Sequence, residues 1–92
     1  MLVRKKLIIQ NKQGLHVRPA AIFVRLANKF DSEITVRKGQ KRVNGKSIMG
    51  ILTLGCEKGS RIEIVADGRD AERAIKELSQ FLDKDEESER KE

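Results

Sequence analysis

The stretch around which the chain is organised is GLHVRPA, residues 14–20, which holds the only histidine and the only proline of the protein. Gly14 suits a tight turn. The residues after it predict the first turn of a helix, because a proline is tolerated there, where its missing N–H would have no helical partner. His16 therefore stands at a predicted helix start, with Arg18 two positions later.

The chemistry of His16 depends on this position. The outward-pointing N–H groups of a helix start, the positive end of the helix dipole and the guanidinium of Arg18 all favour a neutral imidazole over an imidazolium. A neutral ring is a nucleophile, and the same donors would hold a phosphoryl group once it is attached. A lone histidine is more often structural, so the residues by themselves leave both interpretations open.

Hydrophobic periodicity predicts seven elements in the order β-α-β-β-α-β-α. The predicted strands cover residues 3–9, 33–37, 41–44 and 61–66, and the predicted helices run from 17 to 28 or 29, from 48 to 52 or 53, and from 71 to 82. Strands with one apolar face and three helices to cover it predict an α+β fold, an open-faced two-layer sandwich. The pattern leaves open whether the sheet is mixed or antiparallel.

Length and composition indicate one small domain. The 92 residues, 38% hydrophobic and 37% charged, allow a single modest core. The first ten residues are too short and too charged for a signal peptide, and no apolar run approaches the ~20 residues of a membrane helix. Cys56 is the only cysteine, interpreted as a space-filling residue, so no internal disulfide or C-x-x-C metal site can form. We therefore expect a cytoplasmic protein with no membrane insertion and no metal.

The formal net charge of +6 is unevenly distributed. Residues 83–92 carry six acids and three bases, so we expect residues 1–82 to form the domain and residues 83–92 a frayed, charged tail. A basic body favours an anionic partner, either nucleic acid, a phosphorylated group or an acidic protein surface. Nucleic acid is disfavoured, because Phe23, Phe30 and Phe81 all fall on helix core stripes and leave no ring to stack on bases.

A second candidate site is NGKSIMG, residues 44–50, which follows the predicted hairpin. Ser47 is typical of a helix N-cap. A phosphate on Ser47 would suit the helix dipole and would place negative charge beside Ile48 and Met49. The same stretch with Gly39 resembles a nucleotide-binding P-loop, but five residues instead of four separate its glycines, so no nucleotide cofactor is expected.

Residues 14–20 resemble the active-site signature of the HPr family, the histidine-containing phosphocarriers of the bacterial phosphoenolpyruvate-dependent sugar phosphotransferase system. The similarity continues through residues 23–24, 32–36, 43–50 and 52–55, and covers nearly all of residues 2–82. It implies an open-faced β-sandwich of four antiparallel strands and three helices. The sequence departs from the family at Val17, where alanine or threonine is commoner, and in its longer charged tail.

The resemblance also implies roles for individual residues. His16 would accept a phosphoryl group on Nδ1 from phosphorylated enzyme I and pass it to A-type enzyme II components, with Arg18 stabilising the phosphate. Ser47 falls on the regulatory serine of the family, the target of an HPr kinase/phosphorylase in many bacteria that links the protein to a catabolite-control transcription regulator. The residues that match the partner-docking surface are Val17, Ala21, Ile48, Met49 and Leu52.

The implied protein is a monomeric carrier that needs partner enzymes for turnover and is not itself an enzyme. An alternative output is the signalling of nitrogen or carbon status without sugar uptake, which uses the same histidine and surface. Because His16 is present, the sequence does not resemble the family branch that lacks this histidine and serves only in catabolite control.

Overall fold

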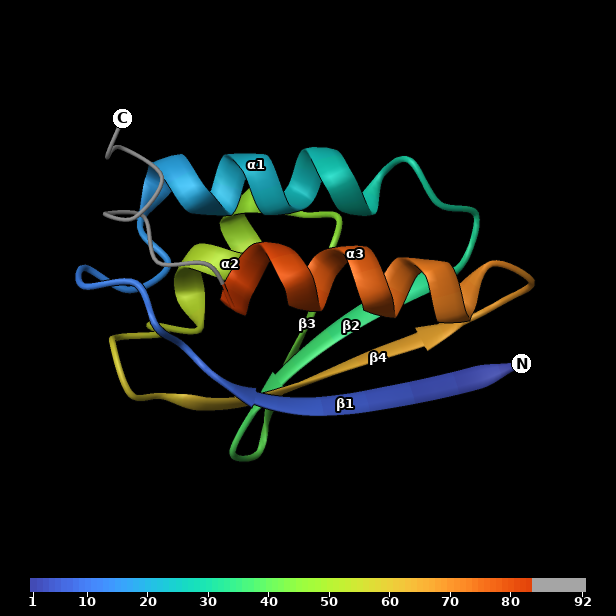
Figure 1. Cartoon of the computed structure of the whole chain (residues 1–92). Helices are drawn as coiled ribbons and strands as arrows, with labels where there is room; N and C mark the ends of the chain where they lie inside the picture. The colour runs from blue at the N-terminus through green and yellow to red at the C-terminus, as the bar shows by residue number, and fades with distance from the viewer. Residues whose placement is uncertain (84–92) are drawn as a thin grey trace.

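The computed structural model describes residues 1–83, and its elements follow the predicted order β-α-β-β-α-β-α (Figure 1). The strands are β1 (Leu2–Ile8), β2 (Glu33–Lys38), β3 (Lys41–Asn44) and β4 (Arg61–Asp67), and the helices are α1 (Val17–Ala27), α2 (Ile48–Thr53) and α3 (Ala71–Asp83). The predicted tail begins inside the last turn of α3, at Asp83, and its remaining residues, 84–92, lie outside the described part of the chain.

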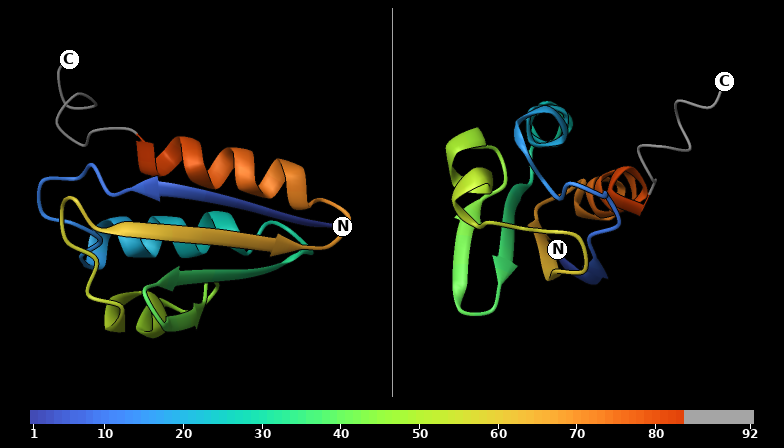
Figure 2. Two further views of the ribbon diagram at one scale, coloured as in Figure 1. Left: turned by 90° about the horizontal axis from the view of Figure 1, so that it is seen from below. Right: turned by 90° about the vertical axis from the view of Figure 1, so that its left-hand side faces the viewer.

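The four strands form one sheet in the order β1-β4-β2-β3, and every neighbouring pair is antiparallel. This confirms the antiparallel sheet that the family resemblance implies. The helices all lie on one side of the sheet, and within residues 1–83 no helix covers the other side (Figures 1 and 2). The fold is therefore the predicted open-faced two-layer sandwich.

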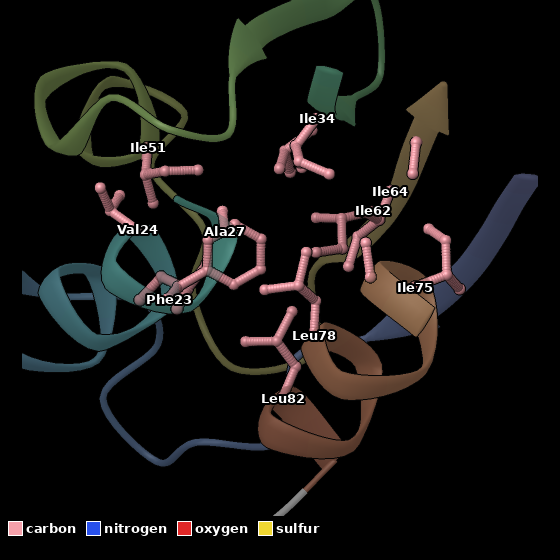
Figure 3. Packing of buried hydrophobic residues seen from close by; sticks show 14 of the residues in the cluster. Phe23, Val24, Ala27, Ile34, Ile51, Ile62, Ile64, Ile75, Leu78 and Leu82 are labelled. Atoms are coloured by element: carbon pink, nitrogen blue, oxygen red, sulfur yellow. The ribbon is translucent and has the colours of Figure 1, made fainter. Parts of the chain in front are cut away.

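The core lies between the sheet and the helices (Figure 3). Strand residues alternate between the two faces of a sheet, and the inward apolar residues of β2 and β4 are buried. On α1 the predicted helical stripe is buried as well, because its members recur every three or four residues. The main core residues are Ala20, Phe23, Ala27, Phe30, Ile34, Val36, Ile51, Ile62, Ile64, Ala66, Leu78 and Leu82.

Asp70, at the start of α3, fixes the connection between α1 and β2. Its carboxylate accepts the N–H of Asp31 at 2.9 Å, the N–H of Ser32 at 3.0 Å and the hydroxyl of Ser32 at 2.5 Å. The Ser32 hydroxyl and these backbone donors stabilise the charged form and lower the pKa of Asp70 to about 2. Asp70 thus holds a loop that lies nearly forty residues away in sequence.

Candidate functional site

His16 is the residue immediately before α1. Its backbone is extended (φ −83°, ψ −170°), and its carbonyl accepts the N–H of Ala20 at 2.9 Å, the first hydrogen bond of the helix. The N–H groups of Val17 and Arg18 belong to the first turn, where helix geometry supplies no intrahelical acceptor. The first turn contains no acidic residue. The imidazole is therefore attached at the positive end of α1, as the sequence predicts.

The segment before His16 is fixed by backbone contacts. The N–H of Gly14 donates to the carbonyl of Asn11 at 3.0 Å, and the N–H of Leu15 donates to the carbonyl of Cys56 at 2.9 Å. Gly14 has a φ of +72°, and a Cβ at this position would collide with the carbonyl oxygen of Cys56. Only glycine satisfies both the left-handed backbone and this close approach, so the turn sets where His16 begins the helix.

Cys56 takes part in this arrangement through its backbone. Its side chain is buried, and burial raises the pKa of its thiol, an effect that the nearby ammonium of Lys38 opposes. The space-filling interpretation of the thiol agrees with this burial. The sequence does not reveal the contact from the Cys56 carbonyl to Leu15, because a backbone acceptor has no side-chain signature.

The imidazole of His16 is partly covered. Nε2 is shielded from solvent, and the residue as a whole is half-buried. The next two residues, Val17 and Arg18, are both exposed. The start of α1 therefore presents a half-buried imidazole followed by an accessible guanidinium.

Ser47 is the N-cap of α2, as predicted. Its Oγ accepts the N–H of Gly50 at 3.0 Å, and its backbone is extended. The residue before it, Lys46, donates from Nζ to the carbonyl of Phe30 at 2.8 Å, just beyond the end of α1. The start of α2 is thereby tied to the loop that follows α1.

Helices α1 and α2 contact each other, and both expose apolar side chains. Val17, Ile48 and Met49 are 64%, 39% and 70% exposed, whereas Ala21 and Leu52 are partly buried. Ile22 is also exposed, at 39%, although sequence reasoning did not single it out. The sequence clue to its exposure was its position outside the apolar core stripe of α1. These six apolar residues of α1 and α2 are together named the docking patch: Val17, Ala21, Ile22, Ile48, Met49 and Leu52.

The described part of the chain contains no group of three or more His, Cys, Asp and Glu side chains that could bind a metal ion. Among the helices of residues 1–83, none combines the length and apolarity needed to span a bilayer.

Residues 3–84 match the family described as PTS HPr component phosphorylation site. The chain is 42% identical to phosphocarrier protein HPr of Borreliella burgdorferi over 82 residues, 89% of this chain and 95% of that protein. It is 43% identical to HPr-like protein Crh of Halalkalibacterium halodurans over 84 residues, 91% of this chain and 100% of that protein.

Solved structures of HPr proteins are similar to this chain as well. A crystal structure of HPr-C-His from Thermoanaerobacter tengcongensis is 49% identical and superposes with a TM-score of 0.85, covering 87% of this chain and 90% of that one. A structure of an HPr dimer from the same organism has a TM-score of 0.71 at 49% identity, covering 90% and 91% of the two chains.

Proposed function

Because the chain belongs to the HPr family of phosphocarrier proteins, we propose that it accepts a phosphoryl group on His16 from phosphorylated enzyme I and passes it to A-type enzyme II components. HPr proteins are carriers and not enzymes, so the partners supply the catalysis. The observation that carries the proposal is the position of His16 at the positive, acid-free start of α1, with Arg18 beside it.

The transfer is a simple exchange of bonds. The lone pair of Nδ1 attacks the phosphorus atom, the new N–P bond forms, and the bond from phosphorus to enzyme I breaks. The phosphoryl oxygens then lie near the N–H groups of Val17 and Arg18 and the guanidinium of Arg18. Donors already oriented toward an anion stabilise it without reorganisation, which is the part of the reaction that this chain contributes.

The direct test is to incubate the protein with phosphoenolpyruvate and enzyme I and to measure acid-labile phosphate. Wild-type protein should take up one phosphoryl group and His16→Ala none. Arg18→Ala should be phosphorylated at least tenfold more slowly, because a charge-assisted donor is lost. Lys76→Ala, an exposed change on α3, is the control and should behave as wild type. Equal labelling of His16→Ala and wild type would refute the proposal.

We further propose Ser47 as a regulatory phosphorylation site of an HPr kinase/phosphorylase, with a catabolite-control transcription regulator as the partner of the phosphorylated form. Ser47 directly precedes two exposed members of the docking patch, Ile48 and Met49. A phosphate there brings a charge of about −1.5 to −2 into an apolar contact surface, and this obstructs docking of enzyme I.

The second candidate function is a regulatory phosphocarrier without sugar uptake, which the 39% identity to Crh, the catabolite repression HPr of Bacillus subtilis, favours. The two outputs are separated by offering phosphorylated protein to purified A-type enzyme II domains. Transfer of the phosphoryl group supports sugar transport, and its absence with an intact phosphohistidine supports signalling. We also expect a cytoplasmic monomer, to be tested by light scattering because a similar HPr has been crystallised as a dimer.

A further inference from the structure

The sheet face opposite the helices carries a cluster of cations. The alternation of side chains turns Leu7, Val36 and Ile62 toward the core, so their neighbours in β1, β2 and β4 point away from the helices. Cross-strand pairing brings Lys6, Glu63, Arg37 and Arg42 into one row. Arg4 and Arg61 lie on the same face in adjacent rows. This basic sheet face is defined as Arg4, Lys6, Arg37, Arg42 and Arg61, around Glu63.

The charges of this face are not balanced by the fold. Glu63 is paired directly with both Lys6 and Arg37, and its Oε1 lies 3.7 Å from Nη1 of Arg37. No second carboxylate is present in this row. Arg37 and Arg42 lie directly opposite each other, and like charges in that position destabilise a sheet. Ion pairing within residues 1–83 therefore does not account for Arg42, Arg4 and Arg61.

The face also has the shape and the apolar groups of a contact surface. Ile8, next to Lys6 along β1 and paired with Arg61, is 45% exposed. Arg37, Gly39, Gln40 and Arg42 line a shallow hollow at the hairpin end of the face. Arginine is one of the residues enriched at protein interfaces.

We propose that the basic sheet face is a second docking surface, which binds an acidic segment of another protein through charge complementarity. It is separate from the docking patch on α1 and α2 and from His16 at the start of α1, because these helices lie on the other side of the sheet (Figure 1). A partner held there leaves His16 accessible, so the carrier can be phosphorylated while it is bound. This inference stands independently of the proposed function.

Glu33 and Asp67, a cross-strand pair, form an acidic end of the same face, outside the basic cluster. Two other occupants, a nucleic acid and a second copy of the chain, fit the basic cluster less well. Phe23 and Phe30 are buried in the core, so neither offers a ring for stacking on bases. A second copy seated on the same face would bring the cations of both chains together, and like charges facing each other across an interface disfavour association.

The test uses the full chain labelled with ¹⁵N and a synthetic polyglutamate peptide as the probe. We expect saturable one-to-one binding, with amide shifts confined to β1, β2, β3 and β4, which weakens when salt is raised to about 0.3 M. The face variant is Arg42→Glu with Arg61→Glu, which leaves the contact between Arg37 and Glu63 intact. It should bind the peptide at least tenfold more weakly.

The matched control is Arg25→Glu with Lys76→Glu, which changes the net charge equally at exposed positions of α1 and α3. It should lose less than twofold in affinity. A milder variant, Arg42→Gln with Arg61→Gln, reports the same contrast if the reversed charges perturb folding. Both double variants of the sheet face should accept phosphate on His16 at the wild-type rate, so a failure of the proposed function and a failure of this inference are distinguishable.

Several outcomes would overturn the inference. These are no peptide binding at millimolar concentration, equal weakening by the face and control variants, or tighter binding of duplex DNA or phosphatidylserine vesicles to the same face. The last experiment removes residues 84–92, because these residues include five acids and could themselves bind a basic surface. If this deletion alone shifts the amides of the sheet face, the chain's own acidic end is the occupant and no partner is required.

Discussion

Ser47 Oγ accepts the backbone N–H of Gly50 at 3.0 Å, so the hydroxyl proposed for phosphorylation is also the cap of the helix that carries Met49. The two roles are compatible, because an anion at a helix N-terminus is stabilised by the same N–H groups and by the dipole. Phosphorylation at this position should therefore change what docks on α2 without unfolding it.

Two substitutions at Ser47 separate capping from charge. Ser47→Ala removes the hydrogen bond to Gly50 and should lower the free energy of unfolding by about 1 kcal/mol, measured by urea denaturation. Ser47→Asp keeps a good cap and should remain within about 0.5 kcal/mol of wild type. Only Ser47→Asp should raise the KM for phosphorylated enzyme I. If the two variants are equally destabilised, or if Ser47→Asp is phosphorylated normally, this account is wrong.

The turn before His16 should tolerate no side chain at Gly14. Gly14→Ala combines a positive φ with a collision against the Cys56 carbonyl, and should cost well over the ~1–2 kcal/mol of the left-handed backbone alone. Gly39→Ala is the matched control, because its φ is +61° and the described structure leaves its Cβ position open. Thermal unfolding of both variants measures the difference. Equal losses would show that the contact with Cys56 is unimportant.

The carboxylate of Asp70 should make the free energy of unfolding depend on pH in the acidic range. Because its pKa is lowered from 3.8 to about 2, the folded state binds this proton less readily than the unfolded state. The stabilisation is complete above the unfolded value and is lost as the pH falls from about 4 towards 2. Asp70→Asn cannot accept the N–H of Asp31 with its amide nitrogen, and should flatten this part of the pH profile of unfolding.

Asp67→Asn is the control for that profile, because Asp67 is an exposed carboxylate whose ion pair with the N-terminal ammonium spans 4.0 Å. It should leave the slope between pH 4 and pH 2 unchanged. An identical slope in wild type and Asp70→Asn would contradict the role of the Ser32 and Asp31 donors.

The elements of this fold were predictable because local rules determine them. The stripe of Ala20, Phe23 and Ala27 has the period of a helix, and the alternation of Ile34 and Val36 has that of a strand. The order of the strands was not predictable from these patterns. β1 lies beside β4, about sixty residues away in sequence, and only the packing of the whole core selects that neighbour.

The candidate site, like the fold, was predictable from sequence only in part. His16 and Ser47 could be placed from sequence, because capping positions follow from neighbouring residues. The contacts that hold them could not be placed, because they come from distant backbone carbonyls, those of Cys56 and Phe30. Cross-strand register also remained hidden, so the cations of β1, β2, β3 and β4 were recognisable only as a basic composition until the sheet assembled them on one face.

Met49 is the most exposed member of the docking patch, and its substitution should affect partner affinity without affecting the fold. Its side chain is 70% exposed, so Met49→Ala creates no cavity and should change the free energy of unfolding by less than about 0.5 kcal/mol. Burial of this side chain against enzyme I contributes about 1.5 kcal/mol, so the KM for phosphorylated enzyme I should rise roughly tenfold with kcat unchanged. Leu2→Ala is the control, since Leu2 is 50% exposed on β1, away from α1 and α2. It should leave the KM unchanged, and an equal rise in both variants would show that the patch on α1 and α2 is not where enzyme I docks.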